Sequence, residues 1–130
     1  MMFVLDTDHC IEILRGRLDV TDRISPAMPL FVTAIGAGEL YYGAHKSDRP
    51  EHHLRQLAAL LQGVTILPFD AQAARIYGRV RADLSRKGEF IGQADLQIAS
   101  IVLRHDFVLV THNQEHFRRV PGLKLDDWLG

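Results

Sequence analysis

The segment MFVLDTDHCIEILR, residues 2–15, indicates the fold class of the whole chain. It opens with an apolar run, Met2–Leu5, which Asp6 ends, and this pattern predicts a short buried strand. A short helix over Asp8–Arg15 is expected to follow. Because the run is continuously apolar rather than alternating, it is typical of a parallel sheet whose two faces are both covered by helices.

The same succession of strand and helix continues along the chain. Further strands are predicted at 30–32, 64–67 and 107–110, with an edge strand at 124–125. Helices are predicted at 33–46 with Thr33 as N-cap, from Pro50 onward, at 70–87 with Asp70 as N-cap, at 93–105 and at 113–117, and 17–25 is a further candidate. This alternation predicts an α/β domain with a central, mainly parallel sheet flanked by helices.

Length and composition limit the classes of protein that the chain can be. Its 130 residues suit one domain spanning 1–130, and 47% hydrophobic residues permit a packed core and exclude a disordered chain. The net charge of -1 gives no overall basic character that would indicate a nucleic-acid partner, although a local patch would suffice. The single cysteine, Cys10, excludes an intrachain disulfide. With no signal-peptide pattern and no apolar run of membrane length, a cytoplasmic location and no membrane association are expected.

Asp6 lies where a parallel α/β sheet usually carries its chemistry, outside the carboxyl end of a strand. A lone acid in this place is equally well explained as the start of the next helix. Asp8, two residues further on, competes for that capping role. We therefore expect Asp6 to be available for a functional role rather than for capping the helix.

Glu39 lies inside the predicted helix 33–46, and its neighbours three and four residues away are Ile35, Gly36, Tyr42 and Gly43. This face is apolar and small, so we expect it to turn toward the sheet. The alternative is that Glu39 lies at the rim of the face and reaches water. Helical glycines cost about 1 kcal/mol each relative to Ala, so two of them favour a close approach by another group.

Asp95 begins the predicted helix 93–105. The helix dipole favours an acid in the first turn by roughly 0.3–1 kcal/mol, which is a sufficient structural explanation for this residue taken alone. Its neighbours at helical spacing are nevertheless apolar or small, which indicates an inward-facing side. They are Ile91, Gly92, Ile98 and Ala99.

Asp6, Glu39 and Asp95 together place three acids on apolar faces near one edge of the predicted sheet. Like charges that are brought together repel and must be neutralised. Mg²⁺ does this with a few carboxylates, waters and substrate phosphate oxygens. Such a site suits the hydrolysis of a phosphodiester by an activated water.

Four segments of the chain, in this order, resemble the PIN domain, and specifically the VapC-type toxins of bacterial toxin–antitoxin pairs: LDTDHCIEILRG, GELYYGAHKS, ILPFDAQAARIYGRVRADLSRKGEFIGQADLQIAS and LVTHNQEHFRRVPGLKLDDWL. The resemblance covers nearly the whole chain. It implies a parallel five-stranded sheet flanked by helices and a Mg²⁺- or Mn²⁺-dependent endoribonuclease that acts on RNA. It also implies a homodimer and a cognate antitoxin whose C-terminal segment blocks the active site.

The resemblance assigns roles to individual residues. Asp6, Glu39 and Asp95 match the first three acids of the family, and all three are expected as metal ligands and catalytic residues. The family often has a fourth acid after the strand at 107–110, where this sequence has Asn113. Asn113 is expected to hold a water or the substrate without adding charge, and Glu115 is an alternative for the fourth position. The number of bound metal ions, one or two, is left open by this substitution.

Two rival functions are considered beside the nuclease. Asp6-Thr7-Asp8 also fits the start of a haloacid-dehalogenase-type phosphatase motif, although Cys10 does not fit its next position. Alternatively, the domain only binds an antitoxin or RNA without turnover. A zinc site at His112 and His116, which have i,i+4 spacing, lacks an evident third ligand.

Overall fold

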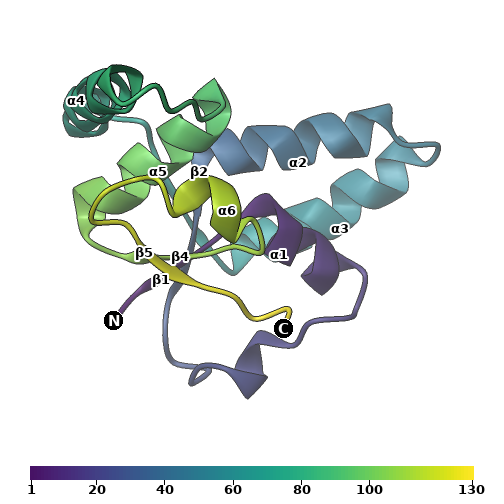
Figure 1. Ribbon diagram of the computed structural model, residues 1–130. Coiled ribbons are helices and arrows are strands. Elements are labelled where there is room, and N and C mark those ends of the chain that lie inside the picture. The colour runs from purple at the N-terminus through teal and green to yellow at the C-terminus, as the bar shows by residue number, and fades with distance from the viewer.

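A five-stranded, entirely parallel sheet forms the centre of the computed structural model, which describes all 130 residues (Figure 1). The strand order is β3-β2-β1-β4-β5, so β1 lies in the middle. The strands are β1 Phe3–Leu5, β2 Leu30–Thr33, β3 Thr65–Leu67, β4 Val108–Val110 and β5 Lys124–Asp126. The predicted α/β class and the five-stranded parallel sheet are confirmed.

Six helices connect the strands. They are α1 Thr7–Leu14, α2 Ala34–Lys46, α3 Pro50–Gln62, α4 Ala71–Arg86, α5 Gln93–His105 and the short α6 Gln114–Phe117. The helix considered for 17–25 is only a 3-10 turn at Val20–Asp22. Asp19 accounts for this difference, because its carboxylate accepts hydrogen bonds from the backbone N–H and the hydroxyl of Thr21 and so favours a turn over a helix. None of the helices is long and apolar enough to cross a membrane.

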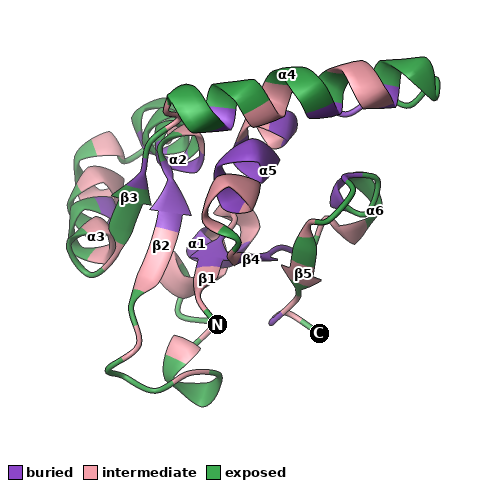
Figure 2. Ribbon diagram, turned by 90° about the vertical axis from the view of Figure 1, so that its left-hand side faces the viewer, coloured by how far each residue is buried: buried purple, intermediate pink, exposed green.

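Two hydrophobic cores lie on opposite faces of the sheet. One is built mainly by α4 and α5 with Val4 and Leu109, and the other by α1, α2 and α3 with Leu5 and Val110. Successive residues of a strand point to opposite faces, so each central strand supplies both cores. Figure 2 shows buried residues on the central strands β1, β2 and β4 and along α5, whereas the edge strands β3 and β5 are mostly exposed or half-buried. Burying each such side chain stabilises the fold by about 1.5–3 kcal/mol.

Helix caps fix where the helices leave the sheet. The Gly36 N–H donates to Thr33 Oγ1 at 2.9 Å, and the Ala73 N–H donates to Asp70 Oδ1 at 2.8 Å. Both predicted N-caps are therefore confirmed. Gly88 follows α4 with φ +70°, the left-handed conformation in which glycine is favoured. These caps orient α2 and α4 as they leave the carboxyl edge of the sheet.

Candidate active site

The carboxyl ends of β1 and β4 lie side by side, because the two strands are parallel and Leu5 pairs with Val110. The backbone N–H of Asp6 continues this pairing by donating to Val110 O at 2.9 Å. Asp6 and Thr111, the residues that follow the two strands, are thereby brought together. The predicted position of the site at this edge of the sheet rests on this pairing.

Asp6 is the N-cap of α1. Its Oδ1 accepts from the Thr7 N–H at 2.9 Å, and its Oδ2 accepts from the Thr111 hydroxyl at 2.7 Å. Burial raises the pKa of Asp6 to about 6. These hydrogen bonds oppose the rise, whereas the negative charges of Asp8 and Asp95 add to it. Asp6 forms no ion pair with any basic side chain, so its charge has no neutralising partner within the chain.

Asp8 does not cap α1. The expectation that Asp8 would compete for the capping role and so leave Asp6 without it is therefore wrong. Asp8 Oδ1 lies 2.7 Å from His9 Nδ1, and Asp8 Oδ2 accepts from the His112 N–H at 2.9 Å. Burial alone would raise the pKa of Asp8, but these hydrogen bonds outweigh it and hold the pKa below its ordinary value. Asp8 is therefore a half-buried carboxylate held by hydrogen bonds within the protein, and it is not the cap of α1.

Glu39 is exposed on α2, so the expectation of an inward-turned face is wrong and the rim alternative is right. The buried side of α2 carries Leu40 and Ala44 instead. The Thr7 hydroxyl donates to Glu39 Oε1 at 2.9 Å and so links Glu39 to the residue beside Asp6. A methyl group on Gly36 would lie 3.3 Å from Thr33 Oγ1 and 3.7 Å from Thr7 Oγ1, whereas one on Gly43 would meet nothing within 4 Å. The close approach therefore occurs at Gly36 alone.

Asp95 lies in the first turn of α5, partly buried, and its side chain is 28% exposed. Ile91, Ile98 and Ala99 are buried, as the predicted inward-facing side requires. Asp95 Oδ2 lies 3.3 Å from His116 Nδ1. Its charge is near enough to Asp6 to contribute to the raised pKa of that carboxyl. Asp95 therefore borders the same edge as Asp6.

Asn113 connects these acids. Its backbone N–H donates to Thr111 Oγ1 at 3.0 Å, and its Nδ2 lies 3.1 Å from His116 Nδ1. Polar contacts thus run from Asp6 through Thr111 and Asn113 to His116, which also contacts Asp95. Glu115 is exposed on α6 and forms no hydrogen bond with this chain of contacts.

The donor atoms at this edge suit a hard divalent cation. No group of three or more His, Cys, Asp or Glu side chains converges closely enough to enclose a metal ion by itself. Mg²⁺ does not require such a cage, because it usually keeps several waters and is held by one or two carboxylates and the substrate's phosphate oxygens. Asp6, partly buried near two other anions and without a basic partner, is the carboxylate that such an ion would stabilise most.

Comparison with known proteins agrees with this geometry. A family model described as the PIN domain matches residues 3–123. The chain is also 33% identical to Ribonuclease VapC2 of Haemophilus influenzae over 131 residues, which cover 99% of each chain. The chain belongs to the VapC group of the PIN-domain family.

Other VapC relatives match over almost their full length. The tRNA(fMet)-specific endonuclease VapC of Salmonella typhimurium is 34% identical, with 98% of each chain covered. Among solved structures, the DNA-bound VapBC of Salmonella typhimurium superposes with a TM-score of 0.91 at 34% identity, covering 98% of both chains. VapBC2 of Rickettsia felis, bound to a promoter DNA fragment, gives a TM-score of 0.90 at 31% identity, covering 98% of this chain and 99% of that one.

Sequence reasoning missed the hydroxyls that hold the acids of this VapC-type domain. Thr111 orients Asp6 and Thr7 holds Glu39, although each hydroxyl lies far in the sequence from the carboxylate it serves. Thr111 directly follows a predicted strand and Thr7 lies two residues after another. This position at the carboxyl ends of the strands is the sequence feature that could have identified them. His116 was considered only as a zinc ligand, and the structure instead places it between Asn113 and Asp95.

Proposed function

We propose that the chain is a metal-dependent endoribonuclease and the toxin of a toxin–antitoxin pair. The observation that carries this proposal is Asp6, a carboxylate of raised pKa beside Asp8 and Asp95, without a basic partner, at the carboxyl edge of a parallel sheet. The names of the relatives, ribonuclease VapC2 and a tRNA(fMet)-specific endonuclease, support RNA as the substrate. Which RNA this chain cleaves is a matter for the experiment below.

Asp6 and Asp95 are the proposed principal ligands of Mg²⁺ or Mn²⁺, with Glu39 contributing directly or through a water. When bound, the ion would supply positive charge to the scissile phosphate and lower the pKa of a water molecule. The Thr111 hydroxyl keeps Asp6 Oδ2 oriented, and the Thr7 hydroxyl keeps Glu39 Oε1 oriented. This arrangement leaves one oxygen of Glu39 free to accept a proton from the attacking water.

Asn113 and His116 form the side of the proposed site nearest α6. The Asn113 amide has two N–H bonds, and one of them suffices for His116 Nδ1 at 3.1 Å. The other is available to a phosphate oxygen. His116 Nδ1 can accept from Asn113 or donate to Asp95 Oδ2, but not both at once.

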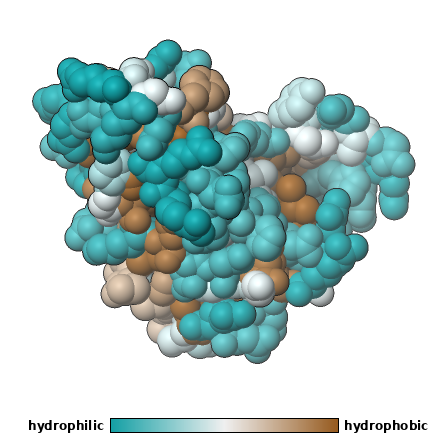
Figure 3. Space-filling view, in the orientation of Figure 1, coloured by the Kyte–Doolittle hydropathy of each residue, from teal (hydrophilic) through white to brown (hydrophobic).

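An antitoxin is the proposed protein partner, because the similar solved structures are VapBC complexes. The chain offers a cavity of about 350 Å³ between α1, α2 and α3, whose lining includes Ile11, Leu14, Leu40, Leu57 and Glu39. Figure 3 shows hydrophobic surface at this cavity, on the right of the molecule. A partner segment that places apolar side chains there would lie against Glu39 and so obstruct the site. A homodimer remains a further proposal from family membership.

The phosphatase alternative is poorly supported by Asp8. Both carboxylate oxygens of Asp8 are engaged within the chain, Oδ1 by His9 Nδ1 at 2.7 Å and Oδ2 by the His112 N–H at 2.9 Å. Position 10, where the phosphatase motif has Thr or Val, is occupied by the buried Cys10, and the hydrogen bonds to Asp8 hold its pKa below the ordinary value despite its burial. The nuclease is therefore the better assignment.

The test is cleavage of total RNA by the purified chain with Mg²⁺, with Mn²⁺ and with excess chelator. Asp95→Asn is measured in parallel, and Asp106→Asn serves as the matched control, since Asp106 is an exposed acid paired only with Lys124. Metal-dependent cleavage that Asp95→Asn abolishes and Asp106→Asn retains supports the proposal. Cleavage that survives both chelation and Asp95→Asn contradicts it. A folded chain that binds metal and cleaves no RNA favours a binding domain without turnover.

A further inference from the structure

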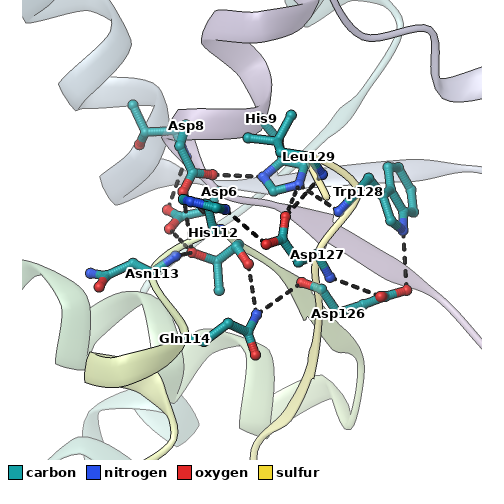
Figure 4. A network of polar contacts seen from close by, with 12 residues as sticks. Asp6, Asp8, His9, His112, Asn113, Gln114, Asp126, Asp127, Trp128 and Leu129 are labelled. Atoms are coloured by element: carbon teal, nitrogen blue, oxygen red, sulfur yellow. Dashed lines mark hydrogen bonds and ion pairs between the residues drawn. The ribbon is translucent and has the colours of Figure 1, made fainter.

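A ring of hydrogen bonds, which we call the polar ring, lies beside the candidate site and consists of Asp8, His9, His112 and Asp127 (Figure 4). His9 Nδ1 lies 2.7 Å from Asp8 Oδ1, and the His112 N–H donates to Asp8 Oδ2 at 2.9 Å. His112 Nδ1 lies 2.8 Å from Asp127 Oδ2, and the ring closes through the next residue, Trp128, whose backbone N–H donates to His9 Nε2 at 3.0 Å. The ring joins the start of α1, the loop after β4 and the carboxy-terminal segment 126–129.

His9 is fully buried, and each of its two ring nitrogens has a partner in the protein. The backbone N–H of Trp128 donates to His9 Nε2 at 3.0 Å, so this nitrogen acts as an acceptor. A neutral ring must then carry its proton on Nδ1, from which it donates to Asp8. Both nitrogens of His9 are thus satisfied only while the carboxy-terminal segment is docked. A buried polar atom left unpaired would cost about 1–3 kcal/mol.

The carboxy-terminal segment is held firmly enough to serve as an anchor. Trp128 is 4% exposed, and its ring lies 5.3 Å from that of Phe3 in an edge-to-face arrangement. The Leu129 N–H donates to Asp127 Oδ1 at 2.9 Å. Burial of Trp128 against β1 therefore fixes the position of Asp127 relative to the sheet.

We propose that His9 and Asp127 are positioning residues, which fix Asp8 and the loop after β4 so that Thr111 donates to Asp6. Thr111 has one hydroxyl proton and two carboxylates within reach, Asp6 Oδ2 at 2.7 Å and Asp8 Oδ2 at 3.4 Å. His9 and the His112 N–H occupy Asp8, which leaves the Thr111 proton to Asp6. Loss of the ring frees Asp8 to compete for that proton and releases the loop. The inference rests on the proposed nuclease function.

Asp127→Ala breaks the ring at its carboxy-terminal member, and Asp127→Asn is the conservative variant. The Asn side chain keeps an oxygen for the Leu129 N–H and an amide that can donate to His112. Arg23→Ala is the matched control, because Arg23 Nη2 donates to Trp128 O at 3.2 Å but has no link to Asp8. His112→Ala opens the ring at an exposed residue, which keeps the test valid if Asp127→Ala does not fold. Trp128 is the only tryptophan, so its fluorescence reports directly whether the segment is docked.

For each variant, kcat and KM of RNA cleavage are measured together with the Trp128 emission and far-UV circular dichroism. We expect Asp127→Ala to shift the emission to the red and to lower kcat about 10-fold or more, with KM nearly unchanged, as for other residues that support a catalytic carboxylate. His112→Ala should lower kcat in the same direction, while Asp127→Asn and Arg23→Ala should stay within about twofold of the wild type.

A released segment with wild-type kcat in Asp127→Ala or His112→Ala would overturn the positioning role. So would a fall in kcat of equal size in Arg23→Ala, since docking alone would then explain the effect. A wild-type protein that cleaves no RNA in the presence of metal would instead count against the proposed function. The two failures are therefore distinguishable.

Discussion

The hydroxyl of Thr111 donates to Asp6 Oδ2 at 2.7 Å and thereby joins the residues that follow the two central strands, β4 and β1. The same oxygen, Thr111 Oγ1, accepts from the Asn113 N–H at 3.0 Å. Thr111 is fully buried, so it reaches these partners without competition from solvent. One side chain thus sets both the orientation of the main proposed metal ligand and the course of the loop that carries Asn113.

Thr111→Val should reduce cleavage strongly while the chain remains folded. Valine has nearly the shape of threonine but has no hydroxyl, so Asp6 loses a hydrogen bond that opposes the rise of its pKa. We expect a loss of about 10–100-fold in kcat and an acid limb of the pH–rate profile displaced to higher pH. Thr111→Ser keeps the hydroxyl and should retain most activity. Equal activity in Thr111→Val and the wild type would show that this contact is dispensable.

Asp6→Asn should stabilise the metal-free protein at neutral pH. The pKa of Asp6 is raised from 3.8 to about 6, so the folded state binds its proton more tightly than the unfolded state does. Its favourable contribution is complete below pH 3.8 and is lost as the pH rises through about 6. Asparagine is an equally good N-cap and carries no charge to desolvate. At pH 7 the variant should gain roughly 2–3 kcal/mol, at 1.36 kcal/mol per pKa unit.

Urea unfolding of wild type and Asp6→Asn, from about pH 5 to about pH 8, measures this difference. The advantage of the variant should grow through about pH 6 and then level off. Added Mg²⁺ should stabilise the wild type and leave Asp6→Asn nearly unaffected, because only a ligand that binds the folded state raises stability. An advantage that does not vary with pH would point to a cause other than the carboxyl group.

Glu39→Gln should affect cleavage and spare stability. Glu39 is exposed, and an exposed substitution usually changes the free energy of unfolding by no more than about 0.5 kcal/mol. Because Glu39 is the proposed proton acceptor, we expect kcat to fall about 100-fold or more. Glu115→Gln, an exposed acid on α6 without a hydrogen bond to the site, should stay within about twofold. A larger effect at Glu115 than at Glu39 would contradict the assignment of Glu39 as the proton acceptor.

Alanine substitutions at two glycines of α2 should have different effects. Gly43→Ala places its methyl group in open space and should stabilise the protein by up to about 1 kcal/mol through helix propensity. Gly36→Ala places a methyl group 3.3 Å from Thr33 Oγ1 and 3.7 Å from Thr7 Oγ1. It should gain less stability or lose some, and it should lower activity because Thr7 holds Glu39. Thermal unfolding and RNA cleavage of both variants test this contrast.

The sheet and its helices were predictable from local patterns, because buried parallel strands are short apolar runs and the N-caps Thr33 and Asp70 stand beside their helices. The choice between Asp6 and Asp8 as the cap of α1 was not. Asp8 is recruited by the backbone of His112, 104 positions away, and no local rule contains that contact. The orientation of Glu39 was not predictable from local patterns either. The small side chains beside Glu39 suggested a face packed against the sheet, but Gly43 on that face is exposed and has nothing close to it.

β1 is only three residues long, yet Val4 belongs to one hydrophobic core and Leu5 to the other. Asp6 therefore directly follows the strand that both hydrophobic cores share. A substitution in either core, even at a side chain remote from the candidate site, would displace Asp6 by shifting this one short strand. If the chain is toxic to its host, spontaneous mutants that survive its expression should carry substitutions distributed through both cores. A screen for such survivors would identify the residues that the packing of the protein requires.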